Sequence, residues 1–351
     1  MKRQTFTSSD YTLEEYLDRI RDDRYPNAHD DVLATCITYL SYRDVCWGPC
    51  KGRRELESRL SRNPFFEYVA RYWGYHACGS SDPNIKDALL NFLMDESAVS
   101  SCGQLTFLDY SDQEEPERMT GMHLAAHFGL AAMIQRLLEK GVAADSSGWM
   151  RRTPLSIAVQ RGLYITVGLL LKRQDVYIDS RDSLGLTPLH YAAMSGSFSV
   201  TTLLIAKGAA IDRRNKRGQA PLHLAAENGY ESTVQVLIDA GSDVNALSDT
   251  KTTPLYRAAR RGHVSVIQRL LAAKADVDLI TYDGYSPLRT AVGYNQTGVV
   301  EALLTARPDL NLVDVDGRTP LEEAWRLRNN DIIRMLENAA SEREKLSLMT
   351  P

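Results

Sequence analysis

Apolar and polar positions recur in a fixed phrase along the second part of this chain. The phrase starts with Thr or Ser, which can cap a helix, in six of its seven copies. It usually continues with Pro-Leu and has Ala at its sixth position. It occurs seven times, 33 or 34 residues apart, and begins at Thr120, Thr153, Thr187, Ala220, Thr253, Ser286 and Thr319. This constant period predicts a stack of repeated units, because each unit buries its apolar face against its neighbours.

Each copy of the phrase predicts a short helix with defined ends. The Thr187 side chain can accept hydrogen bonds from exposed backbone N–H groups, and Pro188 fits the first helical turn. Nine residues after the capping residue, five copies have Gly, which suits the left-handed conformation that ends a helix. Asn295 stands there in the sixth copy and tolerates that conformation, whereas Arg328 in the seventh predicts a turn of another kind. Apolar residues at helical spacing, such as 266–271, predict a second helix in each unit.

The repeated phrase resembles the ankyrin repeat over residues 117–340. This resemblance implies an all-α solenoid of seven repeats, with a charged seventh repeat as the C-terminal cap. The expected repeats are 118–150, 151–184, 185–217, 218–250, 251–283, 284–316 and 317–340, followed by a polar tail, 341–351. In ankyrin proteins the hairpin tips and the outward residues of the first helices line a concave face. The resemblance therefore implies a non-enzymatic binding or scaffold protein that recognises a protein partner on that face.

The first third of the chain lacks the 33-residue period but has helical patterning. Apolar residues recur at helical spacing within residues 32–40, 65–72 and 85–93, and residues 12–15 predict a capping box for a helix through residue 20. We expect a small helical domain over residues 1–110. The acidic, proline-containing stretch 111–117 is the predicted linker to the repeats.

Part of this helical region resembles a second family. Residues 33–41, 48–50 and 63–77 are similar to the segment between the ATPase domain and the ankyrin array of fungal NACHT-type receptors, which are similar to animal NOD-like receptors. This resemblance implies an alternative function, a regulatory sensor fragment that lacks its ATPase domain. The chain has no G-x-x-x-x-G-K-[ST] phosphate loop, so nucleotide-driven switching is not expected. A third alternative is a regulatory subunit of an enzyme.

Charge is divided unevenly along the chain. Residues 1–117 hold 13 basic and 21 acidic residues, whereas residues 118–340 hold 26 basic and 22 acidic residues. A weakly basic array beside an acidic domain indicates either an acidic partner or attraction between the two parts. The excess is too small for general affinity to nucleic acid, which needs many phosphate contacts.

Composition also limits the cellular environment. No apolar run approaches the roughly 18 residues that span a bilayer, and the first residues lack the apolar core of a secretory signal. The five cysteines all precede the repeats, and their odd number favours reduced intracellular thiols over a disulfide framework. We therefore expect a monomer in the cytoplasm or nucleus that does not bind membranes.

No residue pattern in the chain predicts a catalytic or cofactor site. Cys46, Cys50, His76 and Cys78 could form a tetrahedral zinc site, but their spacing matches no common zinc module, so we expect buried thiols and no metal. His123, His190 and His223 stand at the fourth position of the phrase, one per repeat. This spacing is too wide for a shared ligand set and predicts structural hydrogen bonds between neighbouring loops.

Two groups of residues are candidates for the partner-binding surface. The first consists of the cations Arg213, Arg214, Lys216, Arg217, Arg257, Arg260 and Arg261, which could engage carboxylates of an acidic peptide. The alternative for this group is a solvated face that Glu227 and Asp249 partly neutralise. The second consists of possible interface anchors, some of which could instead cover the core: Tyr191, Met194, Tyr230, Tyr256, Tyr282, Tyr285 and Tyr294.

Overall fold

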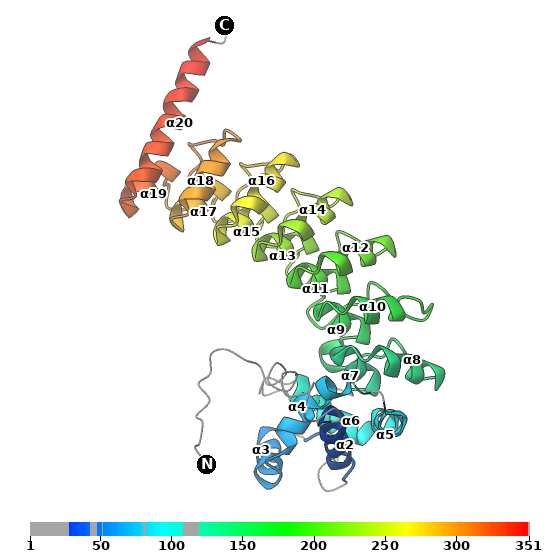
Figure 1. Ribbon diagram of the computed structural model, residues 1–351. Helices are drawn as coiled ribbons and strands as arrows, with labels where there is room; N and C mark the ends of the chain where they lie inside the picture. Colours follow the sequence, from blue (N-terminus) through cyan, green and yellow to red (C-terminus); the bar gives the residue numbers. More distant parts are fainter. Residues whose placement is uncertain are drawn as a thin grey trace. The chain divides into compact units, whose positions relative to one another are not determined.

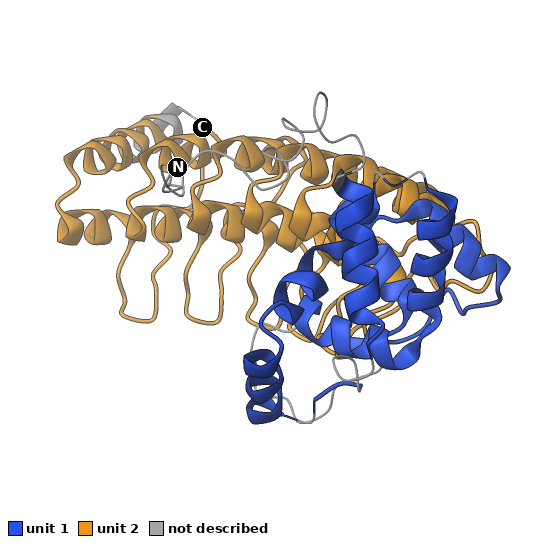
Figure 2. Cartoon of the chain, turned by 60° about the horizontal axis from the view of Figure 1, so that its bottom comes forward, with its two compact units in different colours: residues 1–149 blue, residues 150–351 orange. Residues whose placement is uncertain are grey.

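The computed structural model describes residues 28–42, 48–50, 52–78, 80, 82–107 and 119–349. The helix predicted near residues 12–20 and the predicted linker 111–117 lie outside these residues. Every regular element in the described ranges is helical, which confirms the predicted all-α fold (Figure 1). The chain divides into two compact units, residues 1–149 and 150–351, which we call the N-terminal and C-terminal units (Figure 2).

The N-terminal unit is a helical bundle around a buried tryptophan. The ring of Trp73 is fully buried and makes edge contacts with Phe92 and Phe128, at centroid distances of 5.2 and 5.0 Å. The Trp73 indole N–H donates to the Cys102 sulfur at 3.2 Å. Its helices are α2 (Ala28–Leu40), α3 (Arg53–Arg62), α4 (Phe66–Ala77), α5 (Pro83–Met94), α6 (Glu96–Phe107), α7 (Gly121–Phe128) and α8 (Ala131–Glu139). The first repeat, which consists of α7 and α8, therefore belongs to this unit.

The C-terminal unit contains repeats 2–7 as a stack of helix pairs. Its first helices are α9 (Pro154–Gln160), α11 (Pro188–Ser195), α13 (Pro221–Asn228), α15 (Pro254–Arg261), α17 (Pro287–Gly293) and α19 (Pro320–Leu327). Its second helices are α10 (Tyr164–Leu170), α12 (Phe198–Ala206), α14 (Glu231–Asp239), α16 (Val264–Ala272), α18 (Thr297–Leu304) and α20 (Asn330–Met349). Each helix packs against its counterpart in the next repeat, so the helices form two rows (Figure 1). A 3-10 turn, Trp149–Arg151, lies where the two units meet in sequence.

Local sequence explains the ends of these helices. The Thr187 hydroxyl oxygen accepts from the backbone N–H of His190 at 3.4 Å, as expected for a cap. Asn295 has a φ of 58°, in agreement with the prediction. The different turn predicted at Arg328 was wrong, because Arg328 itself adopts the left-handed conformation with a φ of 57°. The last second helix, α20, continues through residues 341–349 of the predicted polar tail.

Neighbouring repeats are tied by polar contacts as well as by packing. His190 and His223 contact the backbone carbonyls of Gln219 and Thr252 in the following repeat, each at 3.0 Å, which confirms their predicted role. The hairpins are also linked through the backbone, since the Asp249 N–H donates to the Arg217 carbonyl at 3.1 Å. The hairpin loops project to one side of the helix rows (Figure 2). They therefore form a continuous row beside the first helices.

Candidate partner-binding site

A groove of about 640 Å³ runs between the hairpin tips and the first helices of repeats 4 and 5. Hairpin tips form one wall, and residues of α13 and α15 form the other. The lining residues are Lys216, Arg217, Glu227, Asp249, Thr250, Thr252, Tyr256, Arg257, Arg260, Thr281 and Asp283. The stacking of repeats thus brings together side chains that are far apart in the sequence.

Four of the seven predicted cations line this groove, namely Lys216, Arg217, Arg257 and Arg260. Arg213 and Arg214 are exposed but do not contribute to the lining. The Arg214 guanidinium instead donates to the backbone carbonyl of Leu247 at 2.6 Å and so bridges two hairpins. The predicted basic group is therefore divided between the groove and the hairpin edge.

Glu227 is paired with two of the predicted cations. Its carboxylate lies 2.6 Å from the Arg257 guanidinium and 3.1 Å from that of Arg261. Burial acts to raise the pKa of Glu227, but its interactions with the two arginines outweigh that effect and hold the pKa below its usual value. Arg257 is largely buried, with 17% of its side chain exposed. Its charge is therefore paired within the fold. This pairing agrees with the alternative interpretation, in which Glu227 partly neutralises the basic group.

Arg260 has a different environment, because an aromatic ring supports it. Its Nε–H donates to the Tyr294 hydroxyl at 3.1 Å, and its guanidinium carbon lies 5.7 Å from the ring centroid. Both side chains are exposed, and Tyr294 retains 52% of its accessible surface. A cation held over an aromatic ring is pre-positioned and still accessible to a partner.

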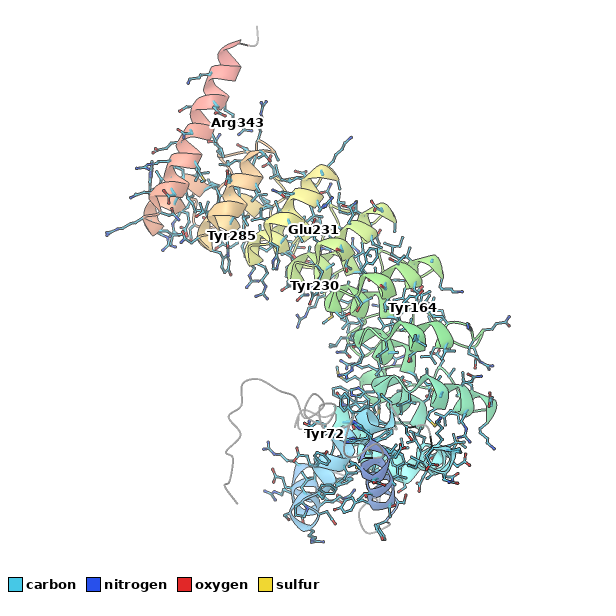
Figure 3. All side chains as sticks on the ribbon, viewed as in Figure 1. Tyr72, Tyr164, Tyr230, Glu231, Tyr285 and Arg343 are labelled. Carbon is cyan, nitrogen blue, oxygen red and sulfur yellow. The ribbon has the colours of Figure 1, made fainter. Side chains whose placement is uncertain are left out.

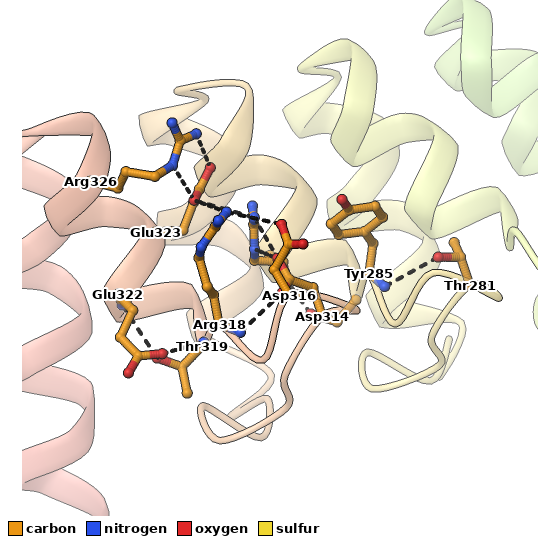
Figure 4. Close-up of polar contacts among 11 residues, drawn as sticks. Thr281, Tyr285, Asp314, Asp316, Arg318, Thr319, Glu322, Glu323 and Arg326 are labelled. Atoms are coloured by element: carbon orange, nitrogen blue, oxygen red, sulfur yellow. Dashed lines mark hydrogen bonds and ion pairs between the residues drawn. The ribbon is translucent and has the colours of Figure 1, made fainter.

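A smaller pocket of about 300 Å³ adjoins the groove and shares Tyr256 with it. It contains the predicted anchors Tyr285 and Tyr294, together with charged residues from repeats 6 and 7. Figure 4 shows the polar contacts around Tyr285 and these residues. The groove and this pocket place candidate anchors beside candidate cations over four consecutive repeats.

A buried ion network under this pocket was not anticipated from the sequence. Arg289, with 7% of its side chain exposed, donates from Nε and Nη2 to Asp314 at 3.0 and 2.7 Å. Glu323 lies 3.3 Å from Arg289 and accepts two hydrogen bonds from Arg326 at 2.7 Å (Figure 4). Arg289 occupies the position that His190 and His223 hold in repeats 3 and 4, so a charged residue at that buried position was the available signal.

The acidic groups of this network remain ionised because of their partners. Burial alone would raise the pKa of Asp314, but hydrogen bonds from the Arg318 backbone and the Arg289 guanidinium hold it below its usual value. Hydrogen bonds from Arg326 lower the pKa of Glu323. The network therefore uses these charges to join repeats 6 and 7.

The other predicted anchors lie elsewhere. Tyr191 is 1% exposed, and its hydroxyl donates to Asp182 at 2.7 Å. Burial and this hydrogen bond raise the pKa of Tyr191 well above its ordinary value. Met194 is 39% exposed but does not line the groove. Tyr191 thus packs within the stack, whereas Tyr285 and Tyr294 remain at the pocket.

The residues considered for zinc do not form a ligand set in the described part of the chain. Cys46 lies outside the described residues, and the others do not belong to a group of three or more metal-ligating side chains. The backbone of Cys50 is paired with the Gln104 side chain, and His76 is buried beside His29, with 3.0 Å between their Nδ1 atoms. Burial raises the pKa of the Cys50 thiol. No helix in the described ranges is both long enough and apolar enough to cross a membrane.

Comparison with known proteins relates the stack to one family. The family model for ankyrin repeats matches residues 76–182, 166–248 and 255–344. Alpha-latrotoxin-Lg1a of Latrodectus geometricus is 36% identical over 97 residues, which are 26% of this chain and 7% of the toxin. Rabankyrin-5 of Homo sapiens is 34% identical over 77 residues, which are 22% of this chain and 7% of that protein. The chain therefore matches only a small part of these relatives.

Solved structures show a similar fold. The ankyrin repeat domain of human ASB11 has a TM-score of 0.58 and 22% identity, and the alignment covers 63% of this chain and 98% of that domain. The ankyrin repeat domain of Bcl-3, a member of the IkappaB protein family, has a TM-score of 0.56 and 28% identity. That alignment covers 63% of this chain and 99% of the Bcl-3 domain. These similarities agree with the observed stack of helix pairs.

Proposed function

The chain belongs to the ankyrin-repeat family, and we propose that it binds a protein partner through the concave face formed by the hairpin tips and first helices of repeats 4–7. Ankyrin repeats are generally non-catalytic modules for protein interaction. The observation that carries the proposal is the groove with its adjoining pocket, in which exposed cations stand beside half-buried Tyr256 and Tyr285 and exposed Tyr294. The exposed cations are not needed to fill the core. Such residues are common anchors of protein interfaces.

The rigidity of the stack supports this proposal. Arg260 rests on Tyr294, and the hairpin tips are linked by backbone hydrogen bonds. A surface that is ordered before binding loses less conformational entropy when a partner docks. Modest contacts spread over several repeats can therefore give a useful affinity.

The remaining predictions about the partner and the cellular setting extend this proposal. An acidic stretch of the partner would meet Lys216, Arg217 and Arg260 at the groove, and we expect the chain itself to be monomeric. The reduced state proposed for the cysteines corresponds to an intracellular location. The alternative of a NACHT-type sensor fragment still rests on residues 33–77 alone, and a longer transcript that encodes a phosphate loop would support it.

Affinity capture from native cells tests the proposed surface. The variant Lys216→Glu/Arg260→Glu reverses two exposed groove charges, and Lys172→Glu/Lys207→Glu makes the same change in exposed residues that follow the second helices α10 and α12. We expect the groove variant to lose captured partners most strongly at low salt, because exposed charges are screened by added ions. The control should capture the same proteins as the wild type. Equal capture by all three folded proteins would refute the proposed surface.

A further inference from the structure

The charges in and beside the groove fall into two classes according to whether the fold already pairs them. Arg257 and Arg261 share the carboxylate of Glu227 at 2.6 and 3.1 Å. In the adjoining pocket, Arg318 lies 3.1 Å from Asp316. Arg318 and Asp316 balance each other, whereas Glu227 balances only one of its two arginines, so that cluster keeps a net charge of +1. All of these charges are already held by a contact within the chain.

The second class consists of exposed charges on both walls. The cations are Lys216, Arg217 and Arg260, and the carboxylates are Asp249 and Asp283. Over the described residues, none of these five lies within ion-pair distance of an opposite charge in the chain. The groove therefore presents accessible charges of both signs.

These accessible charges have a fixed order along the groove. Lys216 and Arg217 stand on the tip between repeats 3 and 4, Asp249 on the next tip, and Asp283 on the tip after that. The backbone bond from the Asp249 N–H to the Arg217 carbonyl, at 3.1 Å, sets the first two tips side by side. The hairpin wall thus changes from positive to negative, while Arg260 on α15 makes the opposite wall positive.

We propose that the groove binds an extended protein segment of mixed charge, an inference that rests on the proposed function. Acidic side chains of the segment pair with Lys216, Arg217 and Arg260, and a Lys or Arg side chain pairs with Asp249 and Asp283. Successive side chains of an extended segment point in opposite directions, so one segment can reach both walls. The position of the acidic residues relative to the basic one sets the direction in which the segment lies.

A segment of mixed charge fits the groove better than a purely acidic segment. Such a segment would bring its carboxylates toward Asp249 and Asp283, and like charges across an interface favour dissociation. A segment with an added Lys or Arg exchanges that repulsion for attraction. The two aspartates therefore act as specificity determinants, and the three cations provide general attraction for acidic sequences.

Peptide display on the immobilised full chain tests this assignment and does not require an identified partner. Random linear peptides are selected, synthesised and measured by fluorescence anisotropy against the wild type and Asp249→Lys/Asp283→Lys. We expect selected peptides to contain both acidic and basic residues. Each lost contact should weaken binding about two- to fivefold, and the variant should prefer peptides in which Glu replaces the basic residue. The matched control is Asp239→Lys/Glu301→Lys, which reverses exposed acidic residues of the second helices.

The other outcomes separate this inference from the proposed function. Purely acidic peptides that bind the wild type and fail with Lys216→Glu/Arg260→Glu would keep the groove as the partner site and overturn the mixed-charge assignment. Peptides that no groove substitution affects, or a selection without enrichment, would count against both. Circular dichroism of each variant shows whether a loss of binding reflects a loss of fold.

Discussion

Repeats 3 and 4 differ from repeats 6 and 7 in the chemistry that joins each repeat to the next. In repeat 3 the Nδ1 atom of His190 accepts from the Thr187 N–H at 3.1 Å, so its Nε2–H donates to the Gln219 carbonyl at 3.0 Å. His223 makes the equivalent contacts in repeat 4. At the same position in repeat 6, Arg289 reaches Asp314 and Glu323 as an ion pair. A neutral imidazole and a charged guanidinium thus meet the same structural requirement.

The first consequence of this difference is a distinct response to acid, and for the two histidines together it is the largest effect we expect. Burial lowers the pKa of His190 and His223 to about 4, whereas an unfolded chain protonates histidine near pH 6.5. Each histidine therefore contributes about 3 kcal/mol above pH 6.5 that is lost as the pH falls from 6.5 through 4. The pKa values of Asp314 and Glu323 are lowered, so their contribution is lost only below about pH 4.

Hydrogen exchange, corrected for intrinsic rates, resolves this contrast by repeat. Between pH 7 and pH 5, the free energy of local opening should fall more in repeats 3 and 4 than in repeats 6 and 7. A uniform fall across the stack would mean that the two kinds of contact respond to acid in the same way.

Breaking the ion network should reveal how much repeats 6 and 7 depend on it. Arg289→Ala leaves the carboxylate of Asp314 buried without its guanidinium partner and removes a second cation from Glu323, so we expect a loss of about 3–5 kcal/mol in unfolding free energy. Arg326→Ala removes an exposed partner of Glu323 and should cost less, because an ion pair with an exposed side chain is screened by solvent. Urea denaturation at pH 7 compares the two variants. Similar denaturation midpoints would show that the buried pair Arg289–Asp314 contributes no more to stability than the exposed contact of Arg326.

Core truncation tests whether the inner repeats are more stable than the cap. Leu222 in repeat 4 is fully buried between neighbours, whereas its counterpart Leu321 in repeat 7 is only partly buried. Leu222→Ala should cost about 2–5 kcal/mol, and Leu321→Ala should cost less, because less apolar surface is lost. Denaturant titrations that rank the two variants in the opposite order would contradict the assigned register.

The smallest expected effect concerns helix ends that are made by different residues in the two regions. Gly196 in repeat 3 and Arg328 in repeat 7 both adopt the left-handed conformation, with φ of 68° and 57°. Arg328→Gly should raise the stability by about 1 kcal/mol, because it removes backbone strain. Gly196→Ala should lower it, since an added Cβ would lie 2.4 Å from the Tyr230 ring. The melting temperatures of the two variants should shift in opposite directions. Shifts of the same sign would argue against backbone strain as the cause.

The sequence predicted the features that depend on local chemistry or on period. The capping threonines, the left-handed Asn295 and the histidine contacts follow from positions within one repeat, so they could be read directly. The pair Arg289–Asp314 joins residues 25 positions apart, and no local signal fixes such partners. Glu227 was predicted to neutralise part of the basic group, but its position 30 residues before Arg257 did not identify Arg257 as the partner. The burial of Tyr191 depends on the direction of one helix face, which the spacing of the anchors does not determine.

Site-specific photo-crosslinking tests the proposed partner surface most directly. Tyr294, at the pocket beside the first helices, and Tyr164, at the start of the second helix α10, are both 52% exposed. Figure 3 shows Tyr285 of the same pocket, in the loop before α17, and Tyr164 at the start of α10. A benzophenone amino acid is placed at position 294 or 164, and cross-linked proteins are identified after irradiation in native cells. We expect a specific partner at position 294 and none at position 164. Cross-links only at position 164 would contradict the account.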